Sequence, residues 1–156
     1  MSQLLDAIDG VPNACEPMPG IVTGGQPTAD HLAALKRAGC EVVLDIRDPM
    51  EPRPYRVPDA VRAAGLEYRN IPVGNGPLTD ATFAAMLSAV RELAGKKRAL
   101  IHCSSGNRVG VSLIPYFMLE QGMDEGEAVT QAMQVGMRSA DLMEQALEYA
   151  RSRQGI

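Results

Sequence analysis

The segment HCSSGNR, residues 102–108, contains the residues best suited to chemistry in this chain. Cys103 ends an apolar run, and Arg108 follows it after four intervening residues. The backbone amides of a short loop and of a helix N-terminus converge on one point and favour negative charge there. A cysteine at that point is stabilised as a thiolate, which is the nucleophilic form of its side chain. We therefore predict that Cys103 is a nucleophile in an anion-binding loop, rather than a cysteine that only fills a core.

The other residues of this segment fit the same role. Gly106 permits backbone torsions that other residues resist, and Arg108 supplies a permanent charge on a planar fork suited to an oxyanion. The predicted anion-binding residues are Ser104, Ser105, Gly106, Asn107 and Arg108. His102 precedes Cys103 on a predicted strand, so its side chain points to the opposite face. We expect His102 to support the loop from behind, and the alternative is a buried histidine without a catalytic role.

Short apolar runs alternate with amphipathic segments along the whole chain. Thr28, Thr79 and Ser139 are typical helix N-caps. Strands are predicted at 21–23, 41–46, 67–73 and 98–103, and helices at 29–39, 60–65, 80–95, 108–121, 124–135 and 139–152. This alternation predicts an α/β fold with a mostly parallel sheet and helices on both faces. In such sheets ligands bind at the carboxyl ends of the strands, which is where Cys103 is expected.

Composition excludes several classes of function. The 156 residues carry a net charge of −4, which argues against a nucleic-acid or anionic-membrane binder. We find no apolar run long enough to cross a membrane and no signal-peptide pattern in MSQLLDAIDG. The three cysteines have no CxxC spacing, so neither a disulfide framework nor a zinc site is indicated. We expect a cytoplasmic protein that needs no metal and no cofactor.

The motifs of this chain resemble those of a known superfamily. HCSSGNR is similar to the active-site loop of protein-tyrosine-phosphatase-like enzymes, in which the catalytic cysteine follows a histidine at a strand end. With GIVTGGQP, EVVLDIR and EYRNIPV in the same order over residues 14–122, the chain resembles the bacterial phosphatase-like domain of the β-lactamase-hydrolase-like family. That domain occurs alone or fused to metallo-β-lactamase-type persulfide dioxygenases. The resemblance implies a three-layer, dual-specificity-phosphatase-like architecture of four or five strands, with one phosphatase-like domain over residues 1–156.

The chain departs from the tyrosine-phosphatase pattern in three ways. Four residues separate Cys103 from Arg108, where those enzymes have five. Val109 stands where they carry a hydroxyl that assists breakdown of the phosphocysteine. The nearest carboxylate for a general acid is Asp80, although its place in a helix first turn also fits a capping role. A loop with four intervening residues resembles that of rhodanese-type sulfurtransferases, which hold a sulfane sulfur on the cysteine.

Three functions therefore remain open. The preferred one is transfer of a sulfane sulfur carried on Cys103, because exchange between thiolates needs no strong general acid. The second is hydrolysis of phosphate monoesters through a phosphocysteine, with Asp80 or water as the proton donor. The third is a non-catalytic pseudophosphatase that binds an anion or a phosphoprotein. The expected substrate is a small anionic or thiol compound such as a persulfide, or a phosphate ester, and the resemblance suggests a partner enzyme of sulfide oxidation.

A proline-rich loop at 47–59 leaves the carboxyl end of a predicted strand, so it is expected to form a rim or lid at the active-site edge. Its charged residues include Arg47, Asp48, Glu51, Arg53 and Arg56. They either recruit an anionic substrate or carrier, or form a solvated charged surface. Cys40 begins a buried strand and is expected to be structural, whereas Cys15 is a candidate resolving thiol.

Overall fold

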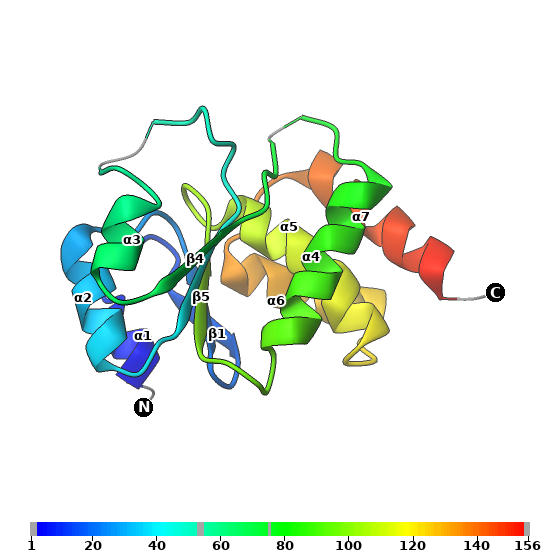
Figure 1. Ribbon diagram of the computed structural model, residues 1–156. Coiled ribbons are helices and arrows are strands. Elements are labelled where there is room, and N and C mark those ends of the chain that lie inside the picture. The colour runs from blue at the N-terminus through cyan, green and yellow to red at the C-terminus, as the bar shows by residue number, and fades with distance from the viewer. Residues whose placement is uncertain (1–2, 53–54, 75, 155–156) are drawn as a thin grey trace.

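A five-stranded sheet forms the centre of the molecule (Figure 1). The computed structural model describes residues 3–52, 55–74 and 76–154. The strands are β1 (Cys15–Met18), β2 (Ile21–Gly24), β3 (Val42–Asp45), β4 (Glu67–Asn70) and β5 (Ala99–His102). Their order across the sheet is β1-β2-β5-β3-β4, and only the β1–β2 pair is antiparallel. The predicted α/β fold with a mostly parallel sheet is thus confirmed.

The register brings the carboxyl ends of four strands to one edge. His102 of β5 lies between Gly24 of β2 and Asp45 of β3, and Asp45 in turn pairs with Asn70 of β4. The loops that follow these strands therefore begin side by side. One of them is the Cys103 loop, and another is the proline-rich loop.

Helices cover both faces of the sheet (Figure 1). They are α1 (Gln3–Ala7), α2 (Ala29–Arg37), α3 (Asp59–Ala63), α4 (Asp80–Leu93), α5 (Asn107–Leu119), α6 (Glu125–Val135) and α7 (Ala140–Arg153). The first three lie on one face, where they pack on Leu100 and its neighbours, and the other four lie on the opposite face, where they pack on Ile101. Successive strand residues face opposite sides of a sheet, so two hydrophobic cores and three layers result.

The main helices begin where the sequence predicts. Thr28, Thr79 and Ser139 each accept a hydrogen bond from a backbone N–H of the following helix turn. Large apolar residues recur every three or four positions along α4, from Phe83 to Leu93, and all of them are buried. These helices therefore form for local reasons and then bury one face against the sheet.

The N-terminal segment departs from the prediction. It contains α1 and the edge strand β1, neither of which was predicted, and β1 tolerates Pro17 because an edge strand does not need every N–H for pairing. Strand β4 ends at Asn70, three residues earlier than expected. Among the described residues, no helix is long and apolar enough to cross a membrane.

Candidate active site

Cys103 lies directly after β5, at the carboxyl edge of the sheet, as predicted. It is buried, and its Sγ accepts a hydrogen bond from the backbone N–H of Gly106 at 3.1 Å. Gly106 has φ 100°, a left-handed conformation that glycine adopts without strain, and it caps the N-terminus of α5. The turn from strand to helix therefore closes around the sulfur atom and directs an amide at it.

Two contacts from the N-terminal part of the chain hold the loop in this orientation. The Ser105 carbonyl accepts a hydrogen bond from Nδ2 of Asn13 at 2.6 Å, and the Ser104 carbonyl accepts one from the backbone N–H of Gln26 at 3.1 Å. The C=O and N–H of a trans peptide point in opposite directions. Pulling the Ser105 carbonyl toward Asn13 therefore turns the N–H of Gly106 toward Cys103.

We predict that Asn13→Gly lowers the rate at which Cys103 reacts as a nucleophile by about tenfold, the equivalent of one hydrogen bond of roughly 1.4 kcal/mol. Asn13 has φ 56°, so glycine removes the side-chain donor without straining the backbone. The rate at which iodoacetamide alkylates Cys103, followed by intact-protein mass spectrometry, measures the effect. Asn13→Asp, which keeps the size but replaces the donor by a carboxylate that repels the Ser105 carbonyl oxygen, should lower the rate at least as much. A wild-type rate in both variants would show that Asn13 does not orient the loop.

Arg108 is buried in the first turn of α5 and uses one end of its guanidinium group to bind Glu51. Its Nη1 and Nη2 donate to Oε2 and Oε1 of Glu51 at 2.6 and 2.9 Å, and Nη1 also donates to the Val73 carbonyl at 2.9 Å. Three of the five N–H groups are thus used, and the remaining two lie on the Nε–Nη2 edge. Burial opposes the charge, but the hydrogen bonds to Glu51 and the neighbouring Cys103 outweigh it and raise the Arg108 pKa. Arg108 is therefore a fixed cation beside the thiol.

Glu51 belongs to the proline-rich loop, and a local network brings it to this position. Its Oε2 accepts the backbone N–H of Asp48 at 2.8 Å, while Arg47 binds Oε1 of Glu51 at 3.5 Å. Arg47 is itself buried and hydrogen-bonds the side chain of Gln26 and the carbonyl of Pro52. The hydrogen bonds from Arg108 lower the pKa of Glu51 from 4.5 to about 2. Glu51 is thus a carboxylate at neutral pH, and its charge holds the guanidinium group in place.

Comparisons with known proteins show the family of this chain. A family model described as the rhodanese-like domain matches residues 28–134, which is more than half of the chain. The chain belongs to this family. Two curated relatives from strains of Xylella fastidiosa, each named β-lactamase hydrolase-like protein, are 30% identical over 92 residues. The match takes in 56% of this chain but only 21% of each relative, so the rhodanese-like domain spans about a fifth of their length.

Solved structures with a similar backbone show the fold of this chain. A candidate phosphatase (DUF442) from Shewanella putrefaciens CN-32 superposes with a TM-score of 0.78 at 20% identity, covering 95% of this chain and 97% of its own. P. aeruginosa TpbA, solved in complex with pTyr, superposes with a TM-score of 0.66 at 20% identity, with coverages of 89% and 82%. At such identities the likeness establishes the protein-tyrosine-phosphatase-like fold.

The other predicted residues of the segment 102–108 differ in exposure and in the contacts they make. Ser104 and Ser105 are exposed at the loop tip. The side chain of Asn107 points elsewhere, because its Oδ1 accepts the backbone N–H groups of Arg138 and Ser139 at 2.6 and 3.2 Å. The Oδ1 atom of Asn107 is thus used by the turn before α7, and only its N–H groups remain for the predicted contact with an anion. The ring of buried His102 contacts the Cys103 carbonyl at 3.2 Å, consistent with support of the loop.

Asp80 and the two other cysteines lie in different settings. Asp80 begins α4 with a side chain 74% exposed, and its carboxylate lies 3.6 Å from the guanidinium group of Arg153 in α7. This placement favours the capping interpretation over general-acid chemistry. Cys40 is buried and donates its thiol hydrogen to the Val42 carbonyl, whereas Cys15 is partly buried on β1. Burial raises the pKa of both thiols, which disfavours their reactive form.

Sequence reasoning did not single out Glu51 or Asn13. Glu51 was considered only as one charge of the loop at 47–59, and Arg53 of that loop lies outside the described residues. The sequence did indicate that the loop of Glu51 and the loop of Cys103 both leave carboxyl ends of parallel strands and so share one edge, but that these strands are neighbours is shown by the structure. Among the described residues, no cluster of His, Cys, Asp or Glu side chains is placed to hold a metal ion.

Proposed function

We propose that this protein is a sulfurtransferase that carries a sulfane sulfur on Cys103. The observation that carries the proposal is the tight loop in which four residues join Cys103 to Arg108 and the amide of Gly106 already contacts Sγ at 3.1 Å. We call the loop of residues 103–108 the cradle. Because it closes so tightly around Sγ, it suits one added sulfur atom better than a phosphoryl group with three oxygens. Membership of the rhodanese-like domain family supports the same chemistry.

The reaction needs no group beyond the cradle. The Cys103 thiolate attacks the outer sulfur of a donor persulfide, the S–S bond of the donor breaks, and the carrier leaves as a thiolate with the electron pair of that bond. Cys103 then bears the persulfide. A second thiolate attacks the outer sulfur of this persulfide, and Cys103 leaves as a thiolate. The loop amides and the two remaining N–H groups of Arg108 stabilise the negative charge that moves between the sulfur atoms.

The surroundings of the cradle offer little help to phosphate-ester hydrolysis. Glu51, the carboxylate bound to Arg108, has a pKa of about 2 and is ionised at neutral pH, so it has no proton to give a leaving group. Val109, which follows Arg108, is buried and has no hydroxyl to assist breakdown of a phosphocysteine. Sulfur transfer requires neither group.

We expect that incubation with thiosulfate or glutathione persulfide adds one sulfur to the wild-type protein, that cyanide removes it, and that Cys103→Ser gains none. Intact-protein mass spectrometry measures the change. Cys40→Ser is the matched control, since its thiol is buried away from the Cys103 loop, and it should load like wild type. Wild-type protein that stays unloaded with both donors would overturn the proposal.

A second candidate is phosphate-ester hydrolysis, favoured by the shared fold with TpbA and the pTyr bound in that protein. In that reaction Cys103 would attack phosphorus, and Arg108 would bind the phosphoryl oxygens. Turnover of an aryl phosphate that is lost in Cys103→Ser, together with no sulfur loading, would replace the first function by the second. We place either activity in the cytoplasm, with an enzyme of sulfide oxidation as the partner for sulfur transfer.

A further inference from the structure

A pocket of about 480 Å³ lies between the proline-rich loop and β4. The rings of Tyr55 and Tyr68 line it, and hydrogen bonds fix both rings: the Tyr55 hydroxyl donates to the Pro27 carbonyl at 3.1 Å, and the Tyr68 hydroxyl to Oδ2 of Asp45 at 2.9 Å. The volume lies within the range of small-molecule sites, which typically combine fixed apolar walls with a few polar groups.

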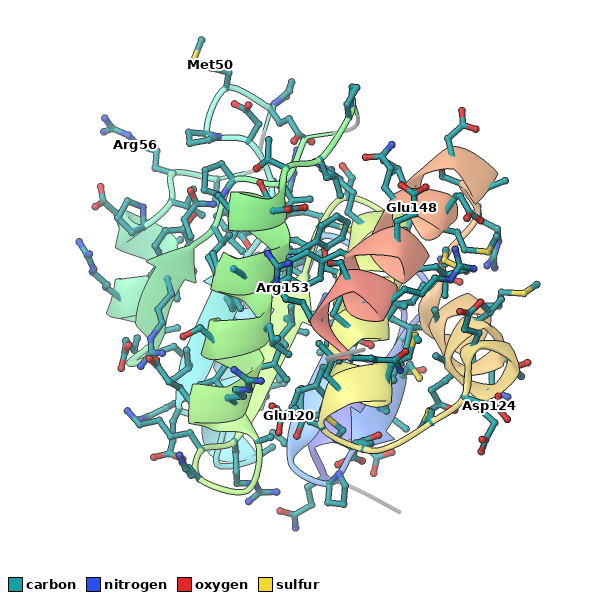
Figure 2. All side chains as sticks on the ribbon, turned by 90° about the vertical axis from the view of Figure 1, so that its right-hand side faces the viewer. Met50, Arg56, Glu120, Asp124, Glu148 and Arg153 are labelled. Carbon is teal, nitrogen blue, oxygen red and sulfur yellow. The ribbon has the colours of Figure 1, made fainter. Side chains whose placement is uncertain are left out.

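Two polar side chains on the pocket wall have capacity to bind a ligand. Arg56 is exposed, extends outward from the loop (Figure 2) and forms no ion pair with any described residue. Asn70 donates both N–H groups of its side chain, to the carbonyls of Asp45 and Arg47 at 2.7 and 2.9 Å. Its Oδ1 is left as an acceptor. The pocket thus offers a cation for a carboxylate and an acceptor for an N–H group.

Glu51 connects this pocket with the cradle. It lines the pocket and at the same time binds Arg108 through both carboxylate oxygens. A molecule in the pocket therefore lies one side chain away from the guanidinium group beside Cys103. This position suits the part of a substrate that is not transferred.

We propose that the pocket binds the carrier of the sulfur donor, a peptide-like thiol whose carboxylate pairs with Arg56 and whose amide N–H reaches Asn70. This inference rests on the proposed sulfur transfer. The outer sulfur of the carrier persulfide is attacked by the Cys103 thiolate, the S–S bond of the carrier breaks, and the carrier leaves as a thiolate. Arg56 and Asn70 take no part in this exchange of bonds. These two side chains determine which carrier the pocket binds.

The test compares glutathione persulfide with the persulfide of glutathione diethyl ester, in which both carboxylates are masked. In wild type, the half-saturating concentration for loading Cys103 should be about tenfold lower for the free acid, as expected for one charge-assisted hydrogen-bonded pair. Arg56→Gln should remove this difference by weakening the free acid, and Arg56→Glu should favour the ester. The maximal loading rate should stay unchanged, because Arg56 does not touch the reacting sulfur atoms.

Arg62→Gln is the matched control, since Arg62 is exposed on α3 but does not line the pocket. It should keep the wild-type preference. If wild type loads equally from both donors, or if Arg56→Gln keeps the preference, the pocket assignment is overturned while sulfur transfer stands. If wild type loads from neither donor, the proposed function itself fails and the pocket assignment fails with it.

Discussion

Replacing Glu51 by alanine should lower the free energy of unfolding by about 3 kcal/mol and slow sulfur loading of Cys103 at least tenfold. The reason is that Arg108 is only 3% exposed, so the change leaves a buried cation without its carboxylate partner. Without Glu51, the guanidinium group keeps its hydrogen bond to the Val73 carbonyl but loses both bonds to the carboxylate that fix its orientation. Urea unfolding measures the first effect, and mass spectrometry of the folded variant measures the second.

The pH dependence of this effect has a definite sign. The pKa of Glu51 is about 2 in the folded protein, against an ordinary value of 4.5, so the folded state binds fewer protons than the unfolded state between these values. The stabilisation by Glu51 is therefore fully present above pH 4.5 and is lost as the pH falls toward 2. The difference in unfolding free energy between wild type and Glu51→Gln should be constant from pH 5 to 8 and shrink below pH 4.5.

Glu67→Ala provides the control. Glu67 also pairs with an arginine, Arg69, but this pair is exposed on the surface and should contribute no more than about 1 kcal/mol. If Glu51→Ala unfolds at the same urea concentration as Glu67→Ala and loads sulfur at the wild-type rate, then Glu51 does not position Arg108. The pair would in that case contribute no more to stability than an exposed ion pair does.

The fold was predictable because its determinants are local. Strands β2, β3 and β5 are short apolar runs, and helices α2, α4, α6 and α7 each begin with an N-cap side chain that bonds the first turn, as Thr79 does in α4. The alternation of these elements then leaves few topologies. The edge strand β1 was missed because four residues that include Pro17 have no alternation of apolar and polar positions to detect.

The candidate site was predictable only where its residues are consecutive. The turn from Cys103 to Arg108 is encoded in six residues, so its place after a strand followed from the sequence. Glu51 lies 57 positions from Arg108, and Asn13 lies 92 positions from Ser105. Their contacts depend on the order of strands in the sheet and on the path of the N-terminal segment. No local pattern carries that information.

Gly25→Ala should displace the backbone of the Cys103 loop, although Gly25 itself lies outside that loop and takes no part in the reaction. A Cβ atom at Gly25 would overlap the Ser104 carbonyl oxygen and lie 3.0 Å from Cα of Ser105. Both obstacles are backbone, so neither can rotate away as a side chain would. The backbone at Gly25 is also held from behind, because its N–H donates to the Pro12 carbonyl at 2.8 Å. The loop of Cys103 therefore has to move.

We expect Gly25→Ala to lower the free energy of unfolding by about 2 kcal/mol, the usual effect of overpacking a close contact, and to slow sulfur loading more than tenfold. The second effect follows because a shift of Ser104 and Ser105 also turns the amide of Gly106 away from Sγ of Cys103. Gly76→Ala is the control: Gly76 is exposed with open space around it, and its variant should stay within about 0.5 kcal/mol of wild type. Wild-type loading by a folded Gly25→Ala variant would mean that the cradle adapts to the added methyl group, and that the orientation of its amides does not control the reactivity of Cys103.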